Sequence, residues 1–222
     1  MGWTAAIITA IIAYIIGSLN ASIIISKVFL KEDIRNSGSG NAGATNMLRT
    51  YGKKMAIATL LFDVFKGVVA VILAGLVDKL LPGSLREGAS FANSHLLGNL
   101  GYIAGLFVAL GHNFPIFFGF KGGKGVATGI GVIFALNPAI GAIVLVVAIS
   151  IMAITRIVSL GSIIGAALFP LLLLAFGLGK GSFSVVSIVI ASLLALLVIV
   201  RHHSNIKRLI NGTENKLGEK KK

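Results

Sequence analysis

The chain has 222 residues, of which 56% are hydrophobic and only 12% are charged, and its mean hydropathy is +0.96. Soluble domains carry roughly 25% charged residues, so this composition excludes a soluble globular domain, and the high hydrophobicity excludes a disordered chain. Because cysteine is absent, disulfides, thiolate metal sites and a cysteine nucleophile are excluded as well. The net charge of +13 falls almost wholly between apolar runs, which predicts an integral membrane protein and no nucleic-acid partner.

Charge-free apolar runs predict the transmembrane helices in chain order. The first, Ala5 to Ile25, is long enough to cross a hydrocarbon core of ~30 Å at about 1.5 Å per residue. No Lys or Arg precedes it, so a cleaved signal peptide is the less favoured alternative. Further runs cover residues 55–77, interrupted by Asp63 and Lys66, and residues 91–110, 157–179 and 181–200. A longer charge-free stretch covers residues 125–155.

The stretch 125–155 decides how many helices cross the membrane. A single crossing would place the two basic segments, residues 27–54 and the C-terminal tail, on opposite sides, against the positive-inside rule. A turn at Asn137–Pro138 instead gives seven crossings and collects sixteen Lys and Arg residues on one side, with three on the other. The piece before this turn, Val126 to Leu136, is too short to cross alone and is expected to stop part-way or to include the preceding glycines.

We therefore predict an all-α integral membrane protein with seven transmembrane helices, some of them short. The N-terminus is expected outside and the C-terminus in the cytoplasm. Residues 1–212 form one polytopic membrane domain, and residues 213–222 form a basic cytoplasmic tail.

The first cytoplasmic segment predicts a phosphate site. Its closely spaced glycines allow successive backbone N–H groups to converge on an anion, and an arginine one helical turn on supplies a planar fork suited to phosphate. A flexible interhelical turn is the alternative. The candidate phosphate-binding residues are Ser39, Gly40, Asn41, Gly43, Thr45, Asn46 and Arg49.

The second segment, residues 111–125, adds two lysines placed between glycines, Lys121 and Lys124. It lacks the complete Walker sequence and no strand precedes it, so nucleotide hydrolysis is not indicated. The lysines could reach an anion as point charges. Their neighbouring phenylalanines are more simply an aromatic belt at the membrane interface.

The third segment places His202, Asn205 and Arg208 on one face of a helix leaving the membrane. Histidine is the side chain suited to proton transfer near neutral pH. A polybasic stripe that binds anionic lipid is the alternative, and we favour it for the lysines of the tail. Within the second span, Asp63 and Lys66 are spaced for mutual neutralisation, with Asp63 also available to orient a basic residue of the site.

In the seven-span arrangement all three segments lie at one membrane surface. They offer cations and histidine but no acidic cluster with metal-ligand spacing, so no metal or other cofactor is expected. Such a pocket suits a phosphorylated small molecule that meets a lipid-soluble chain. A transporter of a phosphorylated small solute is the competing class, although the two halves show no internal repeat; a lipid-binding scaffold would leave the glycine loops unexplained.

The sequence also resembles a known family. The segments GSGNAGATN with the following arginine, GHNFPIFFGFKGGKGVAT and RHHSNIKRLINGTE are similar to the three motifs of the bacterial acyl-phosphate:glycerol-3-phosphate acyltransferases. The similarity also includes FDVFKG at residues 62–67 and SLGSI at residues 159–163. The tail after Glu214 lies outside the pattern, and the His–Asp motif of acyl-CoA-dependent enzymes is absent.

The resemblance implies a seven-span protein of the bacterial inner membrane whose site faces the cytoplasm. It implies transfer of a fatty acyl group from acyl phosphate to glycerol 3-phosphate, giving lysophosphatidic acid for phospholipid synthesis. It places the phosphate-site residues and Lys124 around phosphate, and His202, Asn205 and Ser162 near the reacting hydroxyl. Arg201 and Glu214, together with Asp63 and Lys66, are expected to support the site. The expected partners are the two substrates, membrane lipid and, as an open possibility, the soluble enzyme that makes acyl phosphate.

Overall fold

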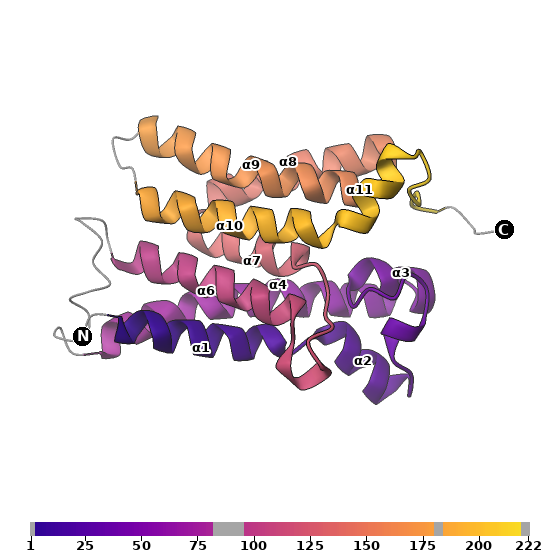
Figure 1. Cartoon of the computed structure of the whole chain (residues 1–222), viewed down its shortest axis with the longest axis horizontal. Coiled ribbons are helices and arrows are strands. Elements are labelled where there is room, and N and C mark those ends of the chain that lie inside the picture. Colours follow the sequence, from indigo (N-terminus) through magenta and orange to yellow (C-terminus); the bar gives the residue numbers. More distant parts are fainter. Residues whose placement is uncertain (1–2, 82–95, 180–183, 219–222) are drawn as a thin grey trace.

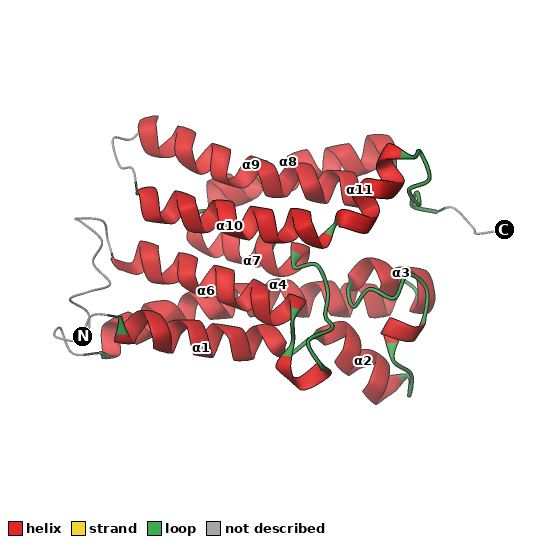
Figure 2. Cartoon of the chain, in the orientation of Figure 1, coloured by secondary structure: helices red, strands yellow, loops and turns green. Residues whose placement is uncertain are grey.

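The computed structural model describes residues 3–81, 96–179 and 184–218, and every regular element within these ranges is helical (Figure 2). Most of the helices run along the long axis of the molecule, with the short helices α2, α3 and α11 gathered at one end (Figure 1). In chain order the elements are α1 (Thr4–Ser18), α2 (Ala21–Phe29), η1 (Ile34–Asn36), α3 (Ala44–Tyr51), α4 (Lys53–Leu80), α6 (Leu96–Asn113), η2 (Ile116–Phe118), α7 (Val126–Leu136), α8 (Pro138–Thr155), α9 (Val158–Gly179), α10 (Val185–Arg201) and α11 (His203–Ile210).

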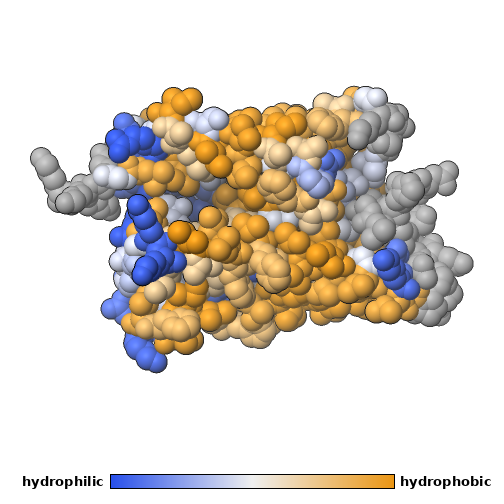
Figure 3. Space-filling model, turned by 180° about the vertical axis from the view of Figure 1, so that it is seen from behind, coloured by the Kyte–Doolittle hydropathy of each residue, from blue (hydrophilic) through white to orange (hydrophobic). Residues whose placement is uncertain are grey.

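Five stretches of the described chain are helical, apolar and long enough to cross a membrane: Thr4–Phe29, Lys53–Leu80, Leu100–Phe118, Pro138–Thr155 and Val158–Gly179. A sixth candidate is α10 taken together with α11, which are bent by 61° relative to each other. The outer surface is also typical of a protein in contact with lipid, because large apolar side chains such as Ile11, Phe65 and Val146 are exposed along these helices. Figure 3 shows them as a broad band, with hydrophilic residues gathered mainly at the end that carries α2 and α3. The protein is therefore a multi-pass membrane protein.

The predicted turn at Asn137–Pro138 is present. α7 covers Val126–Leu136 and remains a short helix of 11 residues, as expected from the sequence. The Asn137 side chain accepts a hydrogen bond from the backbone N–H of Ile140 and caps α8, while Pro138 occupies the first turn, where its missing N–H costs nothing. The start predicted for the third span, near residue 91, lies outside the described residues.

The first span differs from the continuous helix predicted from its apolar run. It is divided between α1 and α2, because the Asn20 side chain accepts a hydrogen bond from the N–H of Ile23 and begins a new helix. The division leaves the carbonyl groups at the end of α1 without partners in that helix. A lysine from α4 satisfies two of them, as described below.

Small residues set the closest helix contacts. α1 packs against α6, and α4 packs against both α6 and α7. A Cβ atom added at Gly17 would lie 2.1 Å from the carbonyl oxygen of Val108, and one added at Gly111 would lie 2.2 Å from that of Tyr14. Membrane helices associate through such close backbone approach, since burial from lipid supplies little driving force. This packing fixes the end of α6, where the second motif begins.

Candidate active site

The three motifs meet around one cavity of about 630 Å³. Polar and charged side chains line one part of it, and the rest is lined by apolar side chains of α4, α7, α8, α9 and α10. The polar lining is made by Ser39, Asn41, Thr45, Asn46, Arg49, Asp63, His112, Lys124, Ser159, Ser162, His202, Asn205, Arg208, Glu214 and Asn215. The cavity can therefore hold a molecule that is charged at one end and apolar at the other.

The first motif forms a loop, residues 37–43, that leads into α3. Asn46 organises this loop: its Nδ2 donates to the carbonyls of Ile34 and Ser37, and its Oδ1 accepts from the backbone N–H of Ser39. Asn46 is only 1% exposed, so its hydrogen-bonding groups are used within the protein. The first-turn N–H groups of α3, at Ala44 and Thr45, have no partner inside the helix, and N–H groups at a helix N-terminus can bind an anion.

The second motif brings Lys124 to the cavity on a tightly held loop, residues 119–125. The backbone N–H of Gly123 donates to the carbonyl of His112 at 3.1 Å. A Cβ atom at Gly123 would lie 2.2 Å from Nε2 of His112 and 2.4 Å from the carbonyl oxygen of Ala42, so only glycine fits here. Arg201 holds the same loop by donating to the Gly123 carbonyl from Nε at 3.2 Å and Nη2 at 3.1 Å.

Lys124 is a partly desolvated cation among other cations. Its Nζ donates to Oδ1 of Asn205. Burial, followed by the charge of the nearby Arg208, lowers the pKa of Lys124 to about 8, and Glu214 opposes this shift. An anionic ligand would restore the favourable environment of the ammonium group, so this position favours the binding of phosphate.

The third motif is not the continuous helix that the sequence predicted. α10 ends at Arg201 and α11 begins at His203, so His202 lies at the bend between them. Its Nδ1 lies 2.7 Å from the carbonyl oxygen of Val198. A carbonyl can only accept, so Nδ1 carries the proton, and in the neutral imidazole Nε2 carries the lone pair.

Glu214 joins the other polar residues of this motif. Its Oε1 accepts from Nδ2 of Asn205 at 2.7 Å, and its Oε2 accepts from Nε of Arg208 at 2.7 Å. The carboxylate is buried, with 4% of its side chain exposed. It therefore fixes the amide orientation of Asn205, whose Oδ1 is then turned to Lys124. The segment after α11 stays on the protein, since the N–H of Leu217 donates to the carbonyl of Arg156 at 2.7 Å.

A buried ion pair borders the cavity, and one of its members, Asp63, lines it. Nζ of Lys66 is 2.8 Å from Oδ1 of Asp63, and the two side chains are 3% and 1% exposed. The mutual neutralisation predicted for this pair is therefore present. Lys66 also donates to the carbonyls of Gly17 and Leu19, each at 3.1 Å, and lies 2.9 Å from Nδ1 of His112. It thereby satisfies carbonyls at the break between α1 and α2.

His112 is a site residue that the sequence did not reveal, as are Ser159 and Asn215. The glycines and phenylalanines around His112 gave no signal for a buried partner of Asp63, 49 positions away in the chain. In the structure it is 3% exposed, lines the cavity and contacts both the ion pair and Gly123. It connects the buried charges to the loop that carries Lys124.

Most, but not all, of the predicted site residues reach the cavity. Ser162 lines it while its Oγ donates to the carbonyl of Val158 at 2.9 Å. Gly40, Lys121, Lys66 and Arg201 are not among the lining residues: Lys121 is exposed, and the last two hold neighbouring backbone. No group of three or more His, Asp or Glu side chains is placed to hold a metal ion in the part of the chain that the structure describes.

Comparison with known proteins identifies relatives over almost the whole chain. A family model described as glycerol-3-phosphate acyltransferase matches residues 7–212. A glycerol-3-phosphate acyltransferase from Thermoanaerobacter pseudethanolicus is 44% identical, and one from Clostridioides difficile is 42% identical, each covering 97% of both chains.

Two solved structures resemble the fold closely. One is a crystal structure of PlsY, an integral membrane glycerol 3-phosphate acyltransferase, in its glycerol 3-phosphate form; it is 37% identical, covers 96% of both chains and has a TM-score of 0.78. The lysophosphatidic acid form of PlsY is 36% identical, has a TM-score of 0.76, and the match covers 96% of this chain and 95% of that one.

Proposed function

The chain belongs to the glycerol-3-phosphate acyltransferase family, and on that premise we propose how its cavity carries out the reaction. The protein is a membrane acyltransferase that acylates glycerol 3-phosphate and forms lysophosphatidic acid for phospholipid synthesis. We infer that the acyl donor is a fatty acyl phosphate. The observation that carries the proposal is a single cavity in which a cationic end continues into an apolar one.

Glycerol 3-phosphate is proposed to bind at the cationic end. Lys124, Arg49 and Arg208 line this part of the cavity, and the first turn of α3 adds backbone N–H groups. Charge-assisted hydrogen bonds to phosphate are the strongest polar contacts available here. Several cations around one cavity also offset the repulsion between two phosphorylated substrates. This compensation is needed when the donor is an acyl phosphate and would not be needed for an uncharged donor.

The fatty chain is proposed to lie in the apolar part, between α4, α7, α8, α9 and α10. Its walls include Phe134, Val144, Phe169 and Leu194. These walls replace the lipid around the chain at little cost, because both surroundings are apolar. A chain held there positions the carbonyl carbon of the donor near the polar residues, where the glycerol hydroxyl attacks.

Attack by the hydroxyl oxygen forms the new ester C–O bond, and the bond from the carbonyl carbon to the phosphate oxygen then breaks. The free Nε2 of His202 accepts a hydrogen bond from the hydroxyl and orients it. The hydroxyl proton passes to this nitrogen or to a phosphate oxygen, and the leaving phosphate departs toward Lys124 and Arg49. A mixed anhydride has a good leaving group, so no acyl-enzyme is required, and alignment supplies much of the rate gain.

We also propose seven crossings, with the site open to the cytoplasm at the bacterial inner membrane. α1 begins at the end of the bundle opposite the one where α10 ends (Figure 1), which supports an odd number of crossings. The site end carries basic residues such as Lys27, Lys53 and Lys207, in agreement with the positive-inside rule.

Labelling of introduced cysteines with a thiol reagent tests this topology, because the chain has no native cysteine. A cysteine introduced at His203 should be labelled only after the membrane is permeabilised, whereas one at Leu80 should be labelled in intact cells.

The donor assignment is tested with purified protein in lipid and labelled glycerol 3-phosphate. Fatty acyl phosphate and fatty acyl-CoA are supplied in separate reactions, without added metal. Lysophosphatidic acid formed from acyl phosphate alone supports the proposal, and product from acyl-CoA alone overturns the assignment of the donor.

The transporter alternative is not favoured, because the polar residues gather at one end of the bundle. Uptake of labelled solute into proteoliposomes without formation of a lipid product would favour a transporter instead. A contact with the soluble enzyme that supplies acyl phosphate stays a prediction.

A further inference from the structure

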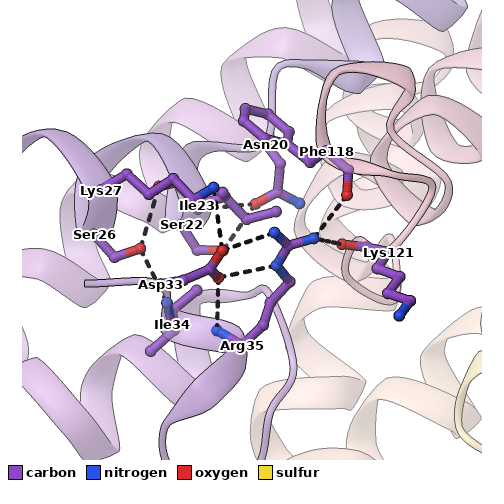
Figure 4. A network of polar contacts seen from close by, with 10 residues as sticks. All are labelled: Asn20, Ser22, Ile23, Ser26, Lys27, Asp33, Ile34, Arg35, Phe118 and Lys121. Carbon is purple, nitrogen blue, oxygen red and sulfur yellow. Dashed lines mark hydrogen bonds and ion pairs between the residues drawn. The ribbon is translucent and has the colours of Figure 1, made fainter. Parts of the chain in front are cut away.

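A polar network outside the cavity joins the first motif to the second. Arg35 is its centre: Nε and Nη2 donate to the two carboxylate oxygens of Asp33 at 2.9 and 2.7 Å. Nη1 donates to the carbonyl oxygens of Phe118 at 2.7 Å and Lys121 at 3.1 Å. In Figure 4 the guanidinium lies between Asp33 and the loop, and only the carbonyl of Lys121 takes part. Arg35 does not line the cavity.

The two carbonyls lie on either side of a turn whose backbone conformation is unfavourable by itself. Between them, Gly119 has φ of 67° and Phe120 has φ of 60°. A left-handed conformation is unfavourable for a bulky residue such as phenylalanine, and it persists only where surrounding contacts determine it. Arg35 contacts the backbone immediately before and immediately after this pair. It therefore fixes the start of the loop that continues to Lys124, whereas Arg201 and His112 hold the same loop further on, at Gly123.

The segment that carries Arg35 is itself held by other contacts. The backbone N–H of Ile34 donates to Oγ of Ser26 at 3.2 Å, and Nζ of Lys27 lies 3.3 Å from Oδ2 of Asp33. Hydrogen bonding from Arg35 holds the pKa of the Asp33 carboxyl well below its usual range, so the carboxylate stays charged at neutral pH. The same segment is fixed to the first motif, since the Ile34 carbonyl accepts from Nδ2 of Asn46.

We infer that Arg35, oriented by Asp33, is a positioning residue that fixes Lys124 against the phosphate-binding turn of α3. The inference rests on the proposed function, since it takes Lys124 and that turn to share one phosphate. Arginine suits the position because its planar fork can meet a carboxylate and two carbonyls at once, which a lysine ammonium cannot do with the same geometry. Arg35 acts on the phosphate only through Lys124, so its effect on binding should depend on the presence of Lys124.

The test is a double-mutant cycle measured as glycerol 3-phosphate affinity, using the full chain in lipid nanodiscs. The variants are Arg35→Ala, Lys124→Ala and both together, with Lys54→Ala as a matched removal of an exposed positive charge at the same end of the bundle. Arg35→Ala should weaken binding about tenfold when Lys124 is present and less than about twofold when it is absent, a coupling in the range seen for residues that act together. Lys54→Ala should bind as the unchanged protein does.

Equal losses in the two backgrounds would overturn the inference, as would unchanged affinity in Arg35→Ala. Failure of the unchanged protein to bind glycerol 3-phosphate would instead overturn the proposed function, and the inference with it. If Arg35→Ala does not fold, the same cycle is made with Arg35→Lys, which keeps the charge and loses the fork. A smaller loss in that variant, again confined to the background that retains Lys124, supports the inference; a loss that persists without Lys124 overturns it.

Discussion

Lys124 should give glycerol 3-phosphate binding an alkaline limit that the other cations of the site do not. Burial and nearby guanidinium groups lower its pKa to about 8, so the charged form is lost as the pH rises through that value. From the definition of the pKa, about 90% of the ammonium is charged at pH 7 and about 10% at pH 9. The arginines stay charged throughout this range, and a phosphate monoester is already doubly ionised above its second pKa of about 6.

The expected magnitude follows from this charge. If only the ammonium form holds the phosphate, affinity for glycerol 3-phosphate falls about tenfold between pH 7 and pH 9. Lys124→Ala should weaken binding at pH 7 by about 10- to 150-fold, because a hydrogen bond to a charged group contributes about 1.5–3 kcal/mol. Lys124→Arg keeps the cation at every pH, so its affinity should stay level from pH 7 to pH 9.

The assay is equilibrium binding of labelled glycerol 3-phosphate to protein in nanodiscs at several pH values. Binding alone is measured, so the alkaline lability of an acyl phosphate does not enter. The same alkaline loss in Lys124→Arg would refute the reasoning, because the titrating group would then lie elsewhere.

Three further predictions concern catalysis, stability and packing. His202→Ala should lower kcat by about 10²- to 10⁴-fold with little change in glycerol 3-phosphate affinity; near-normal turnover would remove this residue from the chemistry. Lys66→Met should destabilise the protein by about 3–5 kcal/mol, since it removes the lysine partner of a buried carboxylate and leaves only His112 beside it. The double variant with Asp63→Asn should recover part of that loss in thermal unfolding, and an unchanged midpoint in Lys66→Met would contradict the pairing. Gly123→Ala should abolish activity because its Cβ would lie 2.2 Å from an imidazole nitrogen, whereas Gly179→Ala, with no neighbour within 4 Å, should remain active; normal activity in both would show that the loop can shift.

The helices were largely predictable because membrane spans depend on composition along the chain. Apolar runs located α4, α8, α9 and α10, and Asn137–Pro138 marked the boundary of α7. The break after Ser18 was not predicted. It depends on one asparagine that caps a new helix and on Lys66, which satisfies the exposed carbonyls from another helix. Such long-range compensation leaves no periodic signal.

The site was predictable as a set of motifs but not as a set of contacts. Motif reasoning brought Lys124, His202 and Asn205 to one cavity, as the structure does. It treated Asn46 as a donor to phosphate, whereas its amide is used to hold the glycine loop. Arg35 gave no signal beyond its charge, because the carbonyls that it binds lie 83 and 86 positions away.

The most direct test of the account is a crystal structure of this protein with glycerol 3-phosphate bound. We predict that the phosphate lies within hydrogen-bond distance of Lys124, Arg49 and the first-turn N–H groups of α3, and that a glycerol hydroxyl faces Nε2 of His202. A phosphate bound away from Lys124 and α3, or a glycerol moiety that cannot reach His202, would contradict the account.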